Sequence, residues 1–137
     1  MKIFKIPVRI YFEDTDTGGV VYHANYLRYF ERGRTEYLRA CGLEQYDMIA
    51  SGRFVFVVSD ITIAYKRPAK LDDLLEIRTS VEKMGRASFI FNQSAWRGDD
   101  LICQASVRVA SVTPEGRPVA MPEEWTTRLQ ASLANNE

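Results

Sequence analysis

Four strand-like runs follow one another after residue 53: the first is rich in Val, Ile and Phe, and hydrophobic and polar positions alternate in the second and third, as they do in half-buried β-strands. These runs cover Phe54–Lys66, Leu74–Lys83, Arg86–Arg97 and Leu101–Thr113, and turn-forming residues separate them. A fifth run near the start, Ile3–Phe12, mixes β-branched and aromatic residues. We therefore predict five strands, of which the last four follow one another in the chain.

Between the first and second predicted strands, the hydrophobic spacing becomes that of a helix. Tyr26, Phe30, Gly33 and Tyr37 recur every three or four residues and so share one helical face. Asn25 is expected to cap the start of this helix, because its side-chain oxygen can accept a hydrogen bond from a first-turn N–H. Gly33 costs about 1 kcal/mol relative to Ala, so we expect it to allow close packing of the helix on a sheet.

The remaining segments complete a single domain spanning residues 1–137. Gly42 fits a left-handed cap at the end of the long helix. A short helix is expected at Pro122–Leu129, followed by a loose tail at 131–137. One helix laid across an antiparallel sheet is the simplest packing of these parts, which predicts an α+β fold.

Composition limits the classes of protein to be considered. Hydrophobic residues make up 46% of the chain, which suits a real core, and 18 basic residues balance 18 acidic ones. This balance argues against nucleic-acid binding through bulk charge. Without a long apolar run, we expect neither a signal peptide nor a membrane span. Cys41 and Cys103 lack metal-ligand spacing, so we expect free thiols in a cytoplasmic protein.

The residues with the most chemical potential lie in 11–36, YFEDTDTGGVVYHANYLRYFERGRTE. Glu13, Asp14 and Asp16 precede a glycine pair, and the only histidine, His23, stands just before the predicted helix. A carboxylate in such a place can act as a base or as a nucleophile. Free backbone N–H groups at a helix start can stabilise a developing oxyanion.

Metal binding explains this cluster less well. An EF-hand loop beginning at Asp14 would need an oxygen ligand at Gly18 and a bidentate glutamate at Asn25. Zinc lacks ligands, because His23 is the only histidine and the nearest cysteine is far along the helix. A purely structural alternative is that Asp14 and Asp16 cap turns around the glycines and that His23 orders the loop. This alternative suits Asp14 better than Asp16.

The run 11–36 resembles the signature of the hotdog-fold acyl-CoA thioesterases, specifically the tol-pal-associated branch related to 4-hydroxybenzoyl-CoA thioesterase. The segment Ala64–Ile77, AYKRPAKLDDLLEI, is also similar to that branch. The likeness extends from Pro7 to about Pro122. It implies a hotdog fold, in which a five-stranded antiparallel sheet wraps a long central helix. It also implies hydrolysis of short-chain or aromatic acyl-CoA without a metal or organic cofactor, coenzyme A being part of the substrate.

Carried over by position, the resemblance implies that Asp16 is the catalytic carboxylate, either a nucleophile or a base that activates water. The backbone N–H of His23 would bind the oxyanion, and its imidazole is similar to one implicated in catalysis. Some relatives carry a tyrosine where this chain has Phe12. Tyr11 precedes it, but alternation along a strand would place the two side chains on opposite faces. A second subtype uses a helix glutamate; for Glu31 we favour a solvated or ion-paired side chain.

The phosphates of coenzyme A need cations near the surface of the protein. Lys66, Arg67 and Arg86 are the candidates for these contacts, although each would also suit an ordinary solvated turn. Aromatic residues are expected to line the acyl pocket: Tyr22, Tyr26, Phe54 and Phe56.

A homodimer or homotetramer is expected, because one helix covers one sheet face and an open sheet leaves edges to protect. The resemblance implies dimers paired edge to edge, with active sites at the interface. Two alternative functions stay open. One is hydration or dehydration of an acyl thioester. The other is a non-catalytic module that docks acyl carrier protein or cell-envelope partners.

Overall fold

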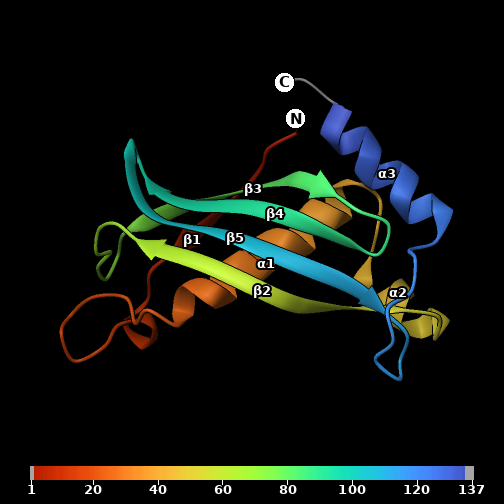
Figure 1. Ribbon diagram of the computed structural model, residues 1–137. Helices are drawn as coiled ribbons and strands as arrows, with labels where there is room; N and C mark the ends of the chain where they lie inside the picture. Colours follow the sequence, from red (N-terminus) through yellow and green to blue (C-terminus); the bar gives the residue numbers. More distant parts are fainter. Residues whose placement is uncertain (1, 135–137) are drawn as a thin grey trace.

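A computed structural model describes residues 2–134, in which one antiparallel sheet wraps around one long helix (Figure 1). The strand order in the sheet is β1-β3-β4-β5-β2. The strands are β1 (Phe4–Arg9), β2 (Val55–Tyr65), β3 (Leu74–Met84), β4 (Ser88–Arg97) and β5 (Asp100–Val112). The helices are α1 (Asn25–Ala40), α2 (Gln45–Ser51) and α3 (Glu123–Ala134), with a 3₁₀ turn at Phe12–Asp14. The predicted α+β architecture and its five strands are confirmed.

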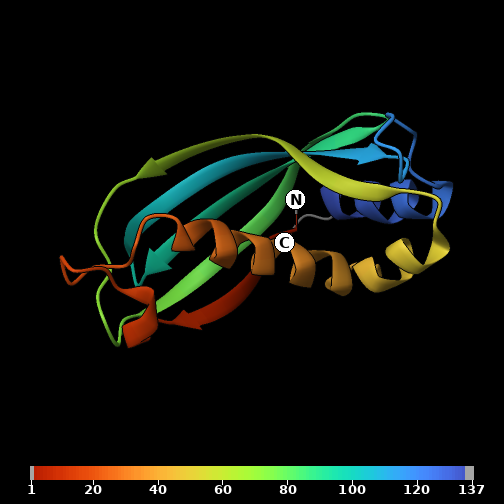
Figure 2. The same cartoon turned by 90° about the horizontal axis from the view of Figure 1, so that it is seen from below.

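Helix α1 lies along the concave face of the sheet, which arches over it (Figure 2). Gly33 is the point of close approach. A Cβ atom there would lie 2.6 Å from Thr79 Oγ1 and 3.0 Å from Gln93 Nε2. The prediction that this glycine allows close packing is confirmed. The buried face of the helix consists of Tyr26, Tyr29, Phe30, Gly33, Tyr37 and Leu38.

A buried glutamine joins α1 to the sheet. Gln93 on β4 is fully buried, and its Nε2 donates to the backbone oxygen of Phe30 at 2.8 Å and to Thr79 Oγ1 at 2.9 Å. Its Oε1 accepts from Arg34 at 3.0 Å. A buried amide left unpaired would cost about 1–3 kcal/mol. These bonds therefore fix the position of the helix on the sheet.

The first strand is shorter than predicted, because the chain turns after Arg9. The carboxylate of Asp14 accepts a hydrogen bond from the backbone N–H of Tyr11 at 2.7 Å, which supports the 3₁₀ turn. Tyr11 and Phe12 are both exposed and lie outside any strand. The argument that placed them on opposite faces of a strand was therefore wrong.

The start of α1 also differs from the prediction. Asn25 is the first residue of the helix, the N-cap position belongs to Ala24, and no side chain caps it. The Asn25 side chain instead donates to the backbone oxygen of Asp14 at 2.9 Å, which holds the preceding loop. At the other end, Gly42 has φ +81°, so the predicted left-handed cap is confirmed.

The C-terminal helix extends beyond its predicted end at Leu129. Residues 131–134, expected to be loose, belong to α3, and 135–137 lie outside the described residues. Ser132 is buried, and its hydroxyl oxygen accepts a hydrogen bond from the Tyr37 hydroxyl at 2.6 Å. This contact ties α3 to α1. Within residues 2–134, no helix is long and apolar enough to cross a membrane.

Strand β2 forms one edge of the sheet and pairs with β5 alone. Three apolar side chains on it are exposed: Val57 by 44%, Val58 by 45% and Ile61 by 39%. An edge strand of eleven residues with exposed apolar side chains is unusual on a free surface, since its unpaired backbone groups and these side chains invite pairing.

Candidate active site

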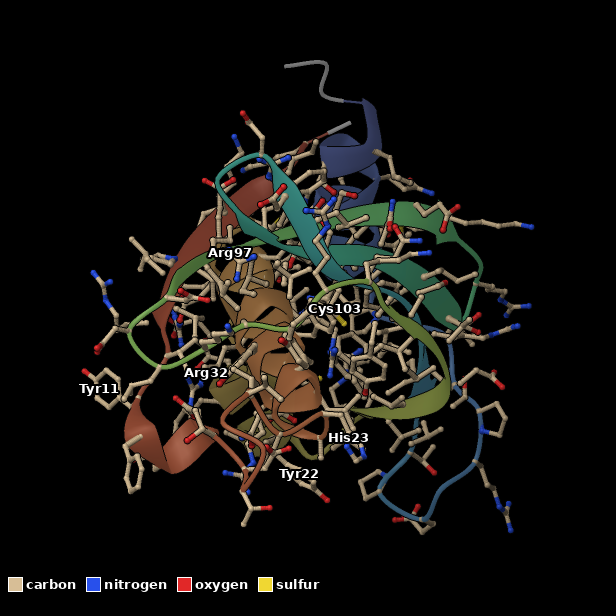
Figure 3. All side chains as sticks on the ribbon, turned by 90° about the vertical axis from the view of Figure 1, so that its left-hand side faces the viewer. Tyr11, Tyr22, His23, Arg32, Arg97 and Cys103 are labelled. Atoms are coloured by element: carbon tan, nitrogen blue, oxygen red, sulfur yellow. The ribbon has the colours of Figure 1, made fainter. Side chains whose placement is uncertain are left out.

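A cavity of about 310 Å³ opens beside the start of α1. Two segments form it: the loop that leads into α1, and the end of β2 with the turn that follows. Figure 3 looks onto this end of the molecule, where His23 projects from the loop. The residues that line the cavity are Val20, Val21, His23, Tyr26, Tyr65, Lys66, Arg67 and Pro68.

Aromatic rings form one wall of this cavity. The Tyr65 ring lies edge-on to His23, with centroids 6.1 Å apart, and also packs against Tyr26 at 5.7 Å. The Tyr65 hydroxyl donates to the backbone oxygen of His23 at 3.1 Å. Burial raises the pKa of Tyr26 to about 12, so its phenol stays neutral near pH 7.

The helix start leaves donors free beside the cavity. The backbone N–H of Asn25 bonds to Tyr22, and that of Leu27 bonds to Ala24. Within residues 2–134, no hydrogen bond occupies the backbone N–H of His23 or of Ala24. Such unsatisfied donors, together with the positive end of the helix dipole, favour an anion or a developing oxyanion.

Asp16 does not face this cavity in the single chain. Its side chain is exposed, and Oδ1 accepts a hydrogen bond from the N–H of Gly18 at 2.8 Å. The Asp16 backbone N–H bonds to Val20, a residue of the cavity wall, at 2.9 Å. The carboxylate therefore caps the glycine turn next to the site, which is the structural alternative considered for it. Its expected approach to a thioester at the start of α1 stays a prediction, because Asp16 is not one of the residues that line the cavity.

The predicted cations separate into two groups. Lys66 and Arg67 line the cavity, and Arg67 also forms an ion pair with Asp100 at 3.1 Å. Arg86 lies in the turn between β3 and β4, at the opposite end of the sheet (Figure 1). Strand β3 has eleven residues and so spans roughly 35 Å. The single chain therefore does not bring Arg86 to the site.

Only one of the four aromatic residues expected in the acyl pocket lines the cavity, namely Tyr26. Tyr22 is 46% exposed and packs against His23, with ring centroids 4.7 Å apart, outside the cavity wall. Phe54 and Phe56 contact each other at 5.6 Å near the start of β2, far from its Tyr65 end. Phe54 and Phe56 therefore do not line this cavity, because the chain runs along β2 away from them before it reaches the cavity.

Tyr65 is the aromatic cavity residue that sequence reasoning missed, and Val20 and Val21 of the wall were not predicted either. Tyr65 ends the long apolar run of β2 and directly precedes Lys66, so its position beside a predicted substrate contact was a usable signal. Tyr11 is no substitute, since Figure 3 shows it on the other side of α1 from His23. Glu31 is exposed and lines a separate cavity of about 90 Å³. Within residues 2–134, no three potential ligand side chains come together as a metal site.

Comparison with known proteins gives a consistent result. Residues 18–104 match the model of a family described as the thioesterase superfamily. The chain is 46% identical over 122 residues to the acyl-CoA thioesterase YbgC of Haemophilus influenzae, covering 88% of this chain and 90% of that protein. It is 44% identical to the acyl-CoA thioester hydrolase YbgC of Escherichia coli, covering 88% and 91%. A solved structure of a probable thioesterase from Bartonella henselae superposes with a TM-score of 0.83 at 38% identity, covering 88% of this chain and all of that one.

Proposed function

Because this chain belongs to the thioesterase superfamily, we propose that it hydrolyses acyl-CoA thioesters whose acyl group is short or aromatic. The free donors at the start of α1 carry this proposal. The N–H groups of His23 and Ala24 stand beside a cavity that two cations, Lys66 and Arg67, also line. A thioester oxygen and the phosphates of coenzyme A are the groups that such donors and cations bind.

In the proposed reaction, the thioester oxygen accepts a hydrogen bond from the N–H of His23. In one route the Asp16 carboxylate attacks the carbonyl carbon and expels the thiolate of coenzyme A, and water then hydrolyses the resulting mixed anhydride to the free acid and restores the carboxylate. In the other route Asp16 removes a proton from the attacking water. In both routes a proton that water gives up ends on the thiolate, which leaves as the thiol. One oxyanion donor of this kind is worth about 3 kcal/mol of barrier. To act on the thioester, Asp16 would have to exchange its hydrogen bond from the N–H of Gly18 for a contact with the substrate or with water. The proposal requires no metal or organic cofactor.

A screen of acyl thioesters tests this function. Purified protein is mixed with acetyl-, hexanoyl-, palmitoyl- and benzoyl-CoA, and the free thiol is followed. We expect thiol release that is fastest for the short and aromatic substrates. Enoyl-CoA hydrated without thiol release would instead support the hydratase alternative, and no reaction with any thioester would contradict an enzymatic function. Acyl carrier protein loaded with the same acyl group tests whether it is a second carrier.

We further propose that two copies pair along β2 to form a homodimer, and that the protein is either this dimer or a tetramer of two such dimers. The exposed Val57, Val58 and Ile61 on this edge support the pairing. Leu27 on α1 is a further exposed apolar residue, with a relative exposure of 41%. Antiparallel pairing would bring the Val55 end of one strand to the Tyr65 end of the other. The end of the sheet that carries Arg86 in one copy would then approach the cavity of the other copy.

A cytoplasmic location is part of the same proposal. Cys41 and Cys103 are free thiols, as is usual in a reducing compartment. An association with tol-pal components stays a prediction from the resemblance. Fractionation of cells that express a tagged chain would test the location, and recovery in the envelope would contradict it.

A further inference from the structure

The segment 66–73, which connects β2 to β3, has two functions at the cavity. Its first part supplies the wall residues Lys66, Arg67 and Pro68. Its second part pairs with the loop that leads into α1, because the N–H of Val21 bonds to the oxygen of Ala69 at 2.9 Å. The position of this segment therefore decides where the cations of the wall lie.

Arg97, the last residue of β4, holds both ends of the turn within this segment. Its Nη1 donates to the backbone oxygen of Pro68 at 3.1 Å and to Asp73 Oδ2 at 2.8 Å. Asp73 Oδ2 also accepts from the N–H of Lys70 at 2.8 Å. The two partners are partly buried, with 34% and 24% of the side-chain surface exposed. A guanidinium that bonds both a carbonyl and a carboxylate fixes direction as well as distance.

A second contact ties the cavity wall to the same hairpin. Arg67 Nη1 lies 3.1 Å from Asp100 Oδ1, and Arg97 Nη2 lies 4.0 Å from Asp100 Oδ2. Asp100 is the first residue of β5, directly after the turn that follows Arg97. The exposed pair between Arg67 and Asp100 adds little stability. Its effect is to limit where the Arg67 guanidinium of the cavity wall can lie.

From these contacts we propose that Arg97 is a positioning residue for substrate binding, an inference that rests on the proposed acyl-CoA thioesterase function. Arg97 does not line the cavity, so it acts through the wall formed by Lys66, Arg67 and Pro68. This wall carries the cations assigned to the phosphates of coenzyme A. Loss of Arg97 should therefore weaken binding of the nucleotide part of the substrate and leave the chemical step nearly unchanged.

The experiment compares Arg97→Met with Arg78→Met. Arg78 on β3 is a matched control, because it is 33% exposed and forms a 2.7 Å ion pair with Glu76 away from the cavity. We expect Arg97→Met to raise KM for acyl-CoA about tenfold with little change in kcat, and Arg78→Met to change neither. With acyl-pantetheine, which lacks the nucleotide, KM should be the same in both variants and in the unmodified protein. Arg97→Lys keeps the charge and one donor group, so its KM should lie in between.

Two results would overturn the inference: an unchanged KM for acyl-CoA in Arg97→Met, or an equal loss with acyl-CoA and acyl-pantetheine. Thermal unfolding of the two Met variants separates positioning from general instability, and if Arg97→Met does not fold, the Arg97→Lys series decides. If the unmodified protein hydrolyses no acyl-CoA, the proposed function fails. Calorimetric binding of coenzyme A then tests Arg97 by itself, with a tenfold weaker affinity in Arg97→Met expected and equal affinity contradicting it.

Discussion

The hydroxyl group of Tyr65 donates a hydrogen bond to the backbone oxygen of His23 at 3.1 Å. This bond joins the end of β2 to the residue just before α1, and so fixes the backbone next to the free N–H groups. We predict that Tyr65→Phe, which keeps the ring, lowers kcat/KM for acyl-CoA roughly two- to tenfold. Tyr46→Phe on the exposed face of α2 is the control. Equal activity of the two variants would show that the bond does not matter for turnover.

Asp16→Asn tests the catalytic carboxylate. Asparagine can still accept the hydrogen bond from the N–H of Gly18, so the glycine turn should survive. We predict a loss of kcat of about a thousandfold, with thermal unfolding and coenzyme A binding unchanged. Asp99→Asn, in the turn between β4 and β5, controls for the loss of an exposed carboxylate. Full activity of Asp16→Asn would refute the assignment.

Val58→Lys tests the proposed assembly. A charge in the middle of the exposed β2 edge should oppose pairing of two such strands. Sedimentation should give the unmodified protein a mass of about two or four times the 15.7 kDa of one chain. The variant should have a mass close to that of a single chain. Ile3→Lys, at another exposed apolar position, should leave the assembly intact. An unmodified protein that sediments as an active monomer contradicts the dimer.

Gly33→Ala tests the close packing of α1. The added methyl group would lie 2.6 Å from Thr79 Oγ1, and such overpacking costs about 1–3 kcal/mol. The better helix propensity of Ala returns about 1 kcal/mol, so we predict a net destabilisation of roughly 0–2 kcal/mol in urea unfolding. At Gly85, where the nearest atom is 3.4 Å away, the same change should be milder. A stabilised Gly33→Ala would show that the contact can relax.

Asp73 gives a pH dependence that can be measured. Burial alone would raise its pKa, but hydrogen bonds from the N–H of Lys70 and from Arg97 outweigh this effect and lower the pKa below its ordinary value of 3.8. A lowered folded-state pKa stabilises the protein above 3.8, and this contribution disappears as the pH falls below 3.8 through the folded value. We therefore expect Asp73→Asn to be less stable than the unmodified protein at pH 7, and nearly equal to it in strong acid. A difference in unfolding free energy that stays constant with pH would contradict this.

The sequence was sufficient for the long elements of the fold and insufficient for their ends. A period-3.6 pattern in α1, period-2 patterns in β4 and β5, and the long Val- and Ile-rich run of β2 each continue over ten or more residues, so neighbouring positions reinforce one another. The end of β1 and the start of α1 depend on single side chains. The Asp14 carboxylate accepts a hydrogen bond from the N–H of Tyr11, and the Asp14 backbone oxygen accepts one from the Asn25 side chain. Neither contact produces a periodic signal in the sequence.

The candidate site was predicted to a similar extent. His23, Tyr26, Lys66 and Arg67 do meet at one cavity, because the loop before α1 and the turn after β2 lie at the same end of the sheet. Arg86 and Phe54 do not, since they lie at the other end of long strands. The contribution of Arg97 depends on contacts between residues far apart in the chain, which a single sequence does not reveal, whereas Tyr65 could have been found from its place next to Lys66.

The three hydrogen bonds of Gln93 have a consequence for the evolution of substrate preference. With α1 fastened to β3 and β4 at its midpoint, a bulkier acyl group cannot be accommodated by sliding the helix, since that would break buried polar contacts. New specificities would have to arise in the loop before α1 and in the segment 66–73. The backbone N–H groups at the start of α1 could then stay unchanged in proteins that act on different substrates.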